Sequence, residues 1–300
     1  MKLILGFSIP LLFGNLFQQF YSMVDTMIVG RVLGTGPLAA VGSTGSITFL
    51  IIGFCLGLCS GFAIPVAQRF GSRDYKELRR FIGNAVWLCV GFGIVLTVLT
   101  VIFCRNILEF MDTPADIIDD AYAYLVVIFA GIPATFLYNM LAGIQRAIGD
   151  SRTPVVILVI ASIINIVLDI VLVVFIPMGV AGAAVATVAS QLIGGVVSLL
   201  YVSKHYEVLK MTREDFKINV PCIKRLLSMG LPMALQTSIT AIGSVILQAS
   251  VNSLGSTVVA SITAGSRLYM FFACAYDAMG VTMSTYSGQN IGARKIDRIG

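Results

Sequence analysis

The 300-residue chain is 57% hydrophobic and 12% charged, with a mean hydropathy of +0.93 and a net charge of +5. Soluble domains carry about 25% charged residues, so this composition excludes a soluble protein and indicates a polytopic membrane protein. The basic residues lie in short runs between apolar segments, a pattern that favours a role in membrane topology over nucleic-acid binding.

Eight apolar runs are long enough to cross a bilayer, which takes about 20 helical residues. They cover residues 3–33, 38–66, 81–103, 121–148, 154–176, 180–202, 226–254 and 257–287. Several runs exceed the thickness of a bilayer, and Pro10, Pro65, Pro133 and Pro232 offer sites for kinks. We therefore expect an all-α, polytopic helical bundle.

The distribution of basic residues predicts the orientation of these spans. If the N-terminus is cytoplasmic, seventeen of the twenty Lys and Arg residues fall in cytoplasmic segments, and only Arg31 and Arg105 fall outside. Because cytoplasmic loops carry an excess of Lys and Arg, we expect a multi-pass protein of the plasma or inner membrane with its N-terminus in the cytoplasm.

Two segments of the chain recur after six spans. GFSIPLLFGNLFQQFYS (6–22) matches SMGLPMALQTSITAIGS (228–244), and VAQRFGSRDYKEL (66–78) matches YSGQNIGARKIDRI (286–299). An even number of spans per copy gives a parallel repeat, which is a known transporter architecture. We expect a first six-span lobe at 1–203, a cytoplasmic amphipathic linker at 204–225, and two spans of a second lobe at 226–300. Eight of an expected twelve spans are then present.

Three acids fall within the spans, and two of them are predicted at the same depth. With a rise of 1.5 Å per residue, Asp25, Asp169 and Thr187 lie about 12 Å below the outer surface, and Asn165 lies one turn deeper. A carboxylate in hydrocarbon costs about 2.5–3.5 kcal/mol on insertion scales. We expect the two acids to offset this cost by sharing a proton or a small hard cation such as Na⁺. The structural alternative is that each acid is buried and hydrogen-bonded to its neighbours.

The chain resembles the multidrug and toxic compound extrusion (MATE) transporters over essentially its full length. The motifs that carry the resemblance are SIPLLFGNLFQQFYSMVDTMIVGRVLG, QRFGSRDYKELRR, IQRAIGDSRTP, INIVLDIVLV, PMGVAGAAVATVASQ and YSGQNIGARK. The resemblance implies two six-span lobes around a central cleft. It implies export of small organic cations by antiport against H⁺ or Na⁺, by a protein that is not an enzyme and needs no other cofactor.

The resemblance also implies roles for particular residues. The coupling cation, including Na⁺ if that is the ion, would bind at Asp25, Asn165, Asp169 and Thr187. A supporting hydrogen-bond network would include Tyr21, Tyr124 and Asn139, and the first span would bend at Pro10. Some branches of the family carry a glutamate in the seventh span, but 226–254 contains no acid, so we expect coupling in the first lobe. Asp277 has no counterpart in the family pattern and is kept as a candidate second-lobe site.

Four other functions were weighed against this prediction. A lipid-linked oligosaccharide flippase of the same superfamily would need a strongly basic cleft, and Arg267 is the only basic residue placed deep in a span. An intramembrane aspartyl protease would need a glycine-aspartate segment that neither Asp25 nor Asp169 has. A passive channel stays open as an alternative. The absence of a GxxxxGK[ST] loop argues against nucleotide binding, and the expected partners of the monomer are organic cations and the bilayer.

Overall fold

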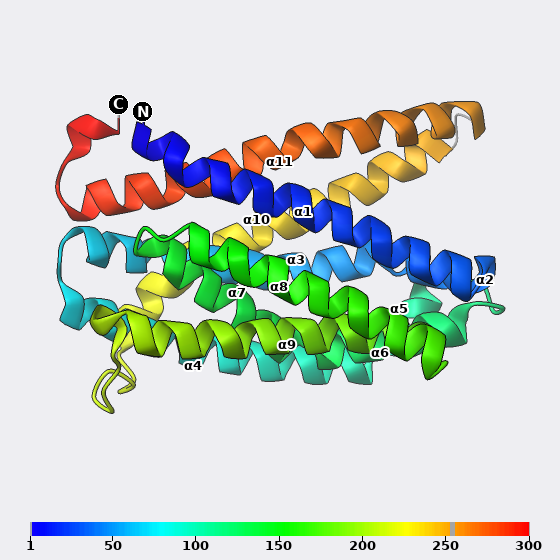
Figure 1. Cartoon of the computed structure of the whole chain (residues 1–300), viewed down its shortest axis with the longest axis horizontal. Helices are drawn as coiled ribbons and strands as arrows, with labels where there is room; N and C mark the ends of the chain where they lie inside the picture. Colours follow the sequence, from blue (N-terminus) through cyan, green and yellow to red (C-terminus); the bar gives the residue numbers. More distant parts are fainter. Residues whose placement is uncertain (1, 253–255, 300) are drawn as a thin grey trace.

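The computed structural model describes residues 2–252 and 256–299, and within these ranges the chain is helical and has no strand. In chain order the α-helices are α1 (Lys2–Val32), α2 (Thr35–Ser43), α3 (Gly45–Gly71), α4 (Tyr75–Ile102), α5 (Cys104–Phe110), α6 (Ile118–Ala130), α7 (Ile132–Ala147), α8 (Arg152–Asp169), α9 (Val180–His205), α10 (Val220–Asn252) and α11 (Ser256–Gly292). A π-helix, η1 (Ile170–Phe175), continues α8, and short 3₁₀ turns lie at η2 (Glu207–Leu209) and η3 (Ile296–Arg298). The long helices run roughly side by side (Figure 1).

The spans agree broadly with the eight apolar runs of the sequence. In the described residues, six helices are long and apolar enough to cross a membrane: α1, α3, α4, α8 with η1, α9 and α10. The pair α6 and α7 makes a seventh span if counted together. The last expected span corresponds to α11, which has 37 residues but is not one of these seven. Residues 253–254, which end the seventh apolar run, lie outside the described ranges.

Two of the expected spans are broken rather than continuous. The run 38–66 is divided between α2 and α3, which part at Thr44. The run 121–148 is divided between α6 and α7, which meet at Gly131 with a bend of 47°. Pro133 stands in the first turn of α7, where its missing N–H costs nothing, so the expected kink there is confirmed. Pro10, Pro65 and Pro232 lie inside uninterrupted helices.

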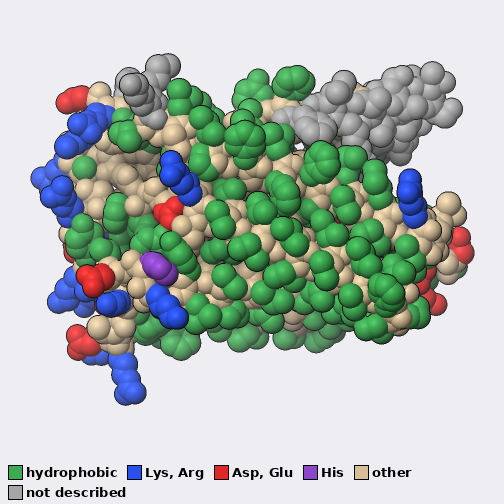
Figure 2. All heavy atoms as spheres, in the orientation of Figure 1, with side chains coloured by type: hydrophobic (Ala, Val, Ile, Leu, Met, Phe, Trp, Pro, Cys, Tyr) green, Lys and Arg blue, Asp and Glu red, His purple; other side chains and the backbone are tan. Residues whose placement is uncertain are grey.

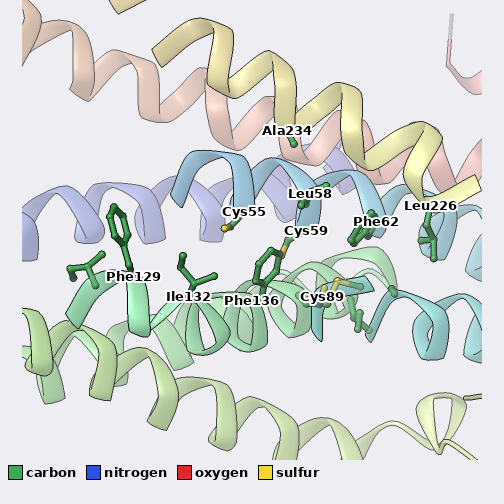
Figure 3. Packing of buried hydrophobic residues seen from close by; sticks show 14 of the residues in the cluster. Cys55, Leu58, Cys59, Phe62, Cys89, Phe129, Ile132, Phe136, Leu226 and Ala234 are labelled. Carbon is green, nitrogen blue, oxygen red and sulfur yellow. The ribbon is translucent and has the colours of Figure 1, made fainter. Parts of the chain in front are cut away.

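Helix α3 is the central element, and glycine allows α10 to pack closely against it. A Cβ atom added at Gly57 would lie 2.5 Å from the Cα of Ala234, and one at Gly61 would overlap the Cα of Gly230. Only residues without a side chain permit two helices to come this close. On its other face α3 packs against α7, so that Cys59 lies near Phe136 in the hydrophobic core (Figure 3).

The repeated motif QxxGxR ends α3 and α11 in the same turn. Arg73 and Arg294 both adopt left-handed backbone angles, with φ of 58° and 56°. The N–H of Arg73 donates to the carbonyl of Phe70 at 3.0 Å, and that of Arg294 donates to the carbonyl of Ile291 at 3.0 Å. The two copies of the sequence repeat therefore share a backbone conformation.

The two copies of this motif also touch one another. A Cβ atom at Gly71 would overlap the carbonyl of Gln289, and a Cβ atom at Gly292 would overlap the carbonyl of Gln68. The contact is reciprocal, because the glycine of each copy lies against the glutamine of the other. We call this contact the QxxG contact.

Charged side chains gather at the end of the molecule that carries both termini. Figure 2 shows most of the visible Lys and Arg side chains at that end, which we call the basic end. It contains the start of α1, the α3–α4 turn, the segment between α9 and α10, and the end of α11. The segment between α9 and α10 lies against α4, because Nε1 of Trp87 donates to the carbonyl of Phe216 at 2.9 Å and Asp215 pairs with Arg79 at 3.5 Å.

Candidate functional site

The structure brings the acids of the first and fifth apolar runs together. Asp25 lies on α1, seven residues before its end at Val32, and Asp169 is the last residue of α8. Helices α1 and α8 pack along one another, and Gly14 of α1 faces Val155 of α8 (Figure 1). The two carboxyl groups are close enough to interact electrostatically.

Apart from one another, the buried oxygens of this pair have no hydrogen-bond partner within the described residues. Asp169 is 0% exposed and Asn165, one turn earlier on the same face of α8, is 2% exposed. Both carboxylate oxygens of Asp169, both polar atoms of the Asn165 amide, and Oδ1 of Asp25 lack a partner. Leaving a buried polar group unsatisfied costs about 1–3 kcal/mol, and more if it is charged. Apart from a bond between the two acids themselves, no described side chain satisfies these atoms, and the role of the pair stays a prediction.

This donor set fits a proton or a hard monovalent cation. Two neighbouring carboxylates in a low dielectric cannot both stay ionised without a compensating positive charge. Their oxygens, with the amide oxygen of Asn165, are ligands that suit Na⁺ rather than zinc or copper. Across the described part of the chain, no group of three or more His, Cys, Asp and Glu side chains is arranged to hold a metal ion.

A π-helix begins directly after Asp169. The sequence predicts one continuous helix over 154–176, but residues Ile170–Phe175 form the π-helix η1. In place of a regular α-helical end, the carbonyl of Leu172 accepts from the N–H of Met178 at 2.9 Å, and Gly182 of α9 packs against the same carbonyl. π-Turns inside helices occur frequently at functional sites. The run IVLVVF is uniformly apolar, so the sequence gives no signal that separates a π-turn from an α-turn here.

Two tyrosines belong to the same cluster. Tyr21 lies one turn before Asp25 on α1, and Tyr124 lies on α6. The hydroxyl of each is close enough to both Asp25 and Asp169 to interact with their charges. Three helices therefore contribute to one cluster of acids and hydroxyl groups, and the predicted supporting role of the tyrosines stays a prediction.

Two other predicted residues make hydrogen bonds within their own helices. The hydroxyl of Thr187 donates to the carbonyl of Ala183 at 3.0 Å, and the amide of Asn139 donates to the carbonyl of Thr135 at 2.8 Å. In the described part of the molecule neither is hydrogen-bonded to an acid. The depth argument that grouped Thr187 with the acids fixes a level in the membrane, but it does not fix the direction of the side chain.

The remaining predicted residues lie apart from this cluster. Asp277 is exposed on α11, and no ion pair involves it within the described residues; the side chain of Arg267 lies outside them. Pro10 stands fifteen residues before Asp25 inside the continuous helix α1. A second-lobe site at Asp277 and a bend at Pro10 both stay predictions.

Known proteins resemble this chain in both sequence and structure. It is 31% identical over 300 residues to "Probable multidrug resistance protein YoeA" of Bacillus subtilis, covering 98% of this chain and 65% of that protein. It is 30% identical to "Probable multidrug resistance protein YpnP" of the same organism, covering 100% of this chain and 67% of that protein. The chain therefore spans about two thirds of the length of these relatives.

Among solved structures, the chain is similar to one described as the outward-facing conformation of a multidrug resistance MATE family transporter of the MOP superfamily. The TM-score is 0.93 at 26% sequence identity, covering 99% of this chain and 66% of that one. The MatE family profile matches residues 10–171 and 232–300. Together with the helical fold and the apolar spans, this match shows that the chain is a multi-pass membrane protein that belongs to the MatE family.

Proposed function

We propose that the chain forms the first lobe and part of the second lobe of a secondary active transporter that exports small organic cations in exchange for H⁺ or Na⁺. The names of its relatives support a multidrug transporter and not a lipid-linked oligosaccharide flippase. Because the chain spans about two thirds of those relatives, transport is proposed for the complete protein that contains it.

The observation that carries the proposal is the pairing of Asp25 with Asp169, in which Oδ1 of Asp25 and both carboxylate oxygens of Asp169 are buried and accept no hydrogen bond from any other described residue. When the pair is ionised it attracts a positively charged substrate. When a proton or Na⁺ binds, this attraction is lost. The substrate cation and the coupling ion therefore compete for the negative charge of the acid pair. Such competition is the condition for antiport. The difference in affinity that such coupling supplies is typically about 1–3 kcal/mol.

Each cluster residue has a separate task in this mechanism. Asp25 and Asp169 hold the coupling ion between α1 and α8, and the amide oxygen of Asn165 is placed to complete the site from one turn deeper. Tyr21 and Tyr124 supply hydroxyl groups that donate to whichever carboxylate stays ionised. The ion enters from the end opposite the basic end, since we assign the basic end to the cytoplasm.

The test is ethidium efflux from proteoliposomes that contain the complete protein. A pH gradient is imposed in one experiment and a Na⁺ gradient in the other, and the gradient that drives efflux identifies the ion. Asp169→Asn should remove gradient-driven efflux while insertion and the thermal unfolding profile stay close to those of the wild type. Full efflux by Asp169→Asn, or ion flux without any substrate, would contradict the proposal, and the second result would favour a channel.

A further inference from the structure

A cavity of about 610 Å³ at the basic end lies between the two lobes. It is lined by the ends of α3 and α11 and the beginnings of α4 and α10. Four arginines line it: Arg69 on α3, Arg80 on α4, Arg225 on α10 and Arg294 just after the end of α11. We call it the arginine cavity.

The positive charge of the arginine cavity is largely uncompensated. Among the described residues that line it, Glu77 is the only acid, and it is paired with Arg80 at 2.7 Å. The guanidinium of Arg69 lies 5.3 Å from the centre of the Phe81 ring, over its face. Within the described residues no carboxylate pairs with Arg69, Arg225 or Arg294. Guanidinium groups gathered in one cavity repel one another, and an anion bound among them would remove this repulsion.

The arginine cavity is formed by residues on both sides of the contact between the lobes, so it requires that contact. Gln68 and Gly292, which take part in the QxxG contact, belong to its lining. If the basic ends of α3 and α11 separated, Arg69 would move away from Arg225 and Arg294. An anion held by arginines of both lobes therefore favours the conformation in which the basic ends are closed.

The position of the cavity points to a lipid as the source of the anion. Trp87 lies seven residues after Arg80 on α4 and is 49% exposed, with its indole N–H bonded to Phe216. Exposed tryptophans are enriched at the boundary between headgroups and hydrocarbon, so a cavity about two turns earlier on α4, nearer its start at the basic end, lies at headgroup level. The cytoplasmic leaflet, to which we assign the basic end, carries the anionic lipids.

We propose that the arginine cavity binds the phosphate group of an anionic phospholipid and that this binding stabilises the closed basic end. The planar guanidinium group offers two parallel N–H donors that match two phosphate oxygens, which a lysine cannot reproduce. The proposal concerns regulation by the membrane and does not depend on which substrate is exported.

Lipid retention by the purified complete protein tests the proposal. Native mass spectrometry counts phosphatidylglycerol and phosphatidylcholine molecules kept by the wild type, by Arg225→Gln with Arg294→Gln, and by the control Lys224→Gln with Arg213→Gln. The control removes the same charge from exposed positions at the same end that do not line the cavity. The arginine variant should bind phosphatidylglycerol about 30-fold more weakly, and the control should bind it like the wild type.

Thermal unfolding supplies the second measurement. Phosphatidylglycerol should raise the melting temperature of the wild type and of the control, but not that of the arginine variant. Equal losses in both variants would mean that only bulk charge attracts the lipid, and unchanged retention in the arginine variant would also overturn the proposal. If inorganic phosphate protects the wild type as well as phosphatidylglycerol does, the ligand is a soluble phosphate and the lipid assignment is wrong.

Discussion

At the basic end, α3 and α11 finish in the same left-handed turn, with Arg73 in one copy and Arg294 in the other. Inside the membrane the two copies differ. With the offset of 222 residues that aligns Pro10 with Pro232, Asp25 of α1 corresponds to Leu247 of α10, which is 65% exposed. The QxxG motif, which both copies share, makes the contact between the lobes. The acid lies on α1, where the two copies differ. Lobe contact and ion coupling therefore depend on separate residues, and variants can address them one at a time.

The largest effect is expected where the copies differ most. Asp25→Asn should lower gradient-driven efflux by about 5- to 150-fold, because it removes the coupling free energy of the acid pair. The matched change at the corresponding position of the other copy, Leu247→Ala, alters an exposed side chain and should leave efflux unchanged. The measurement is ethidium efflux in proteoliposomes at equal protein content. Equal losses in both variants would mean that the two copies share the coupling role.

The second prediction concerns the QxxG contact, where the copies are alike. Gly71→Ala and Gly292→Ala each place a methyl group on a carbonyl of the other copy, so each should destabilise the protein by about 1–3 kcal/mol. Gly280→Ala on α11 is the control, because a Cβ atom there meets open space. Thermal unfolding in detergent measures all three. If only one of the two glycine variants were destabilised, the contact between the two copies would not be reciprocal.

A smaller effect is expected from the glutamines of the same motif. The Nε2 of Gln289 donates to the carbonyl of Ala147 at the end of α7 at 2.8 Å, whereas the side chain of Gln68 has no hydrogen bond to another described residue. In the 300-residue chain, Gln289→Ala should lower the free energy of unfolding by about 1 kcal/mol, and Gln68→Ala should lower it by less. The comparison is again made by thermal unfolding. If both variants lose the same free energy of unfolding, Gln289 contributes by packing and not through its hydrogen bond.

Much of this organisation could be predicted from the sequence, because it depends on regular geometry. The fixed rise of an α-helix is enough to place Asp25 and Asp169 at one depth, and the recurrence of QxxG reveals the repeat. The break at Thr44, the π-helix after Asp169 and the bond made by Thr187 could not be predicted in this way. The bonds involved are local, as in those from Thr187 to Ala183 and from Met178 to Leu172. Which of several local bonds forms depends on packing against other helices, and the local sequence does not specify that packing.

The reciprocity of the QxxG contact has a consequence for the origin of the fold. An interface in which one patch meets its own equivalent is isologous, as in a two-fold symmetric homodimer. A single six-span ancestor with this motif would already have carried the surface needed to pair with a second copy of itself. Gene duplication and fusion would then have turned an association between two molecules into one within a single chain. After fusion the two halves no longer had to be identical, and one of them was free to lose its membrane acid.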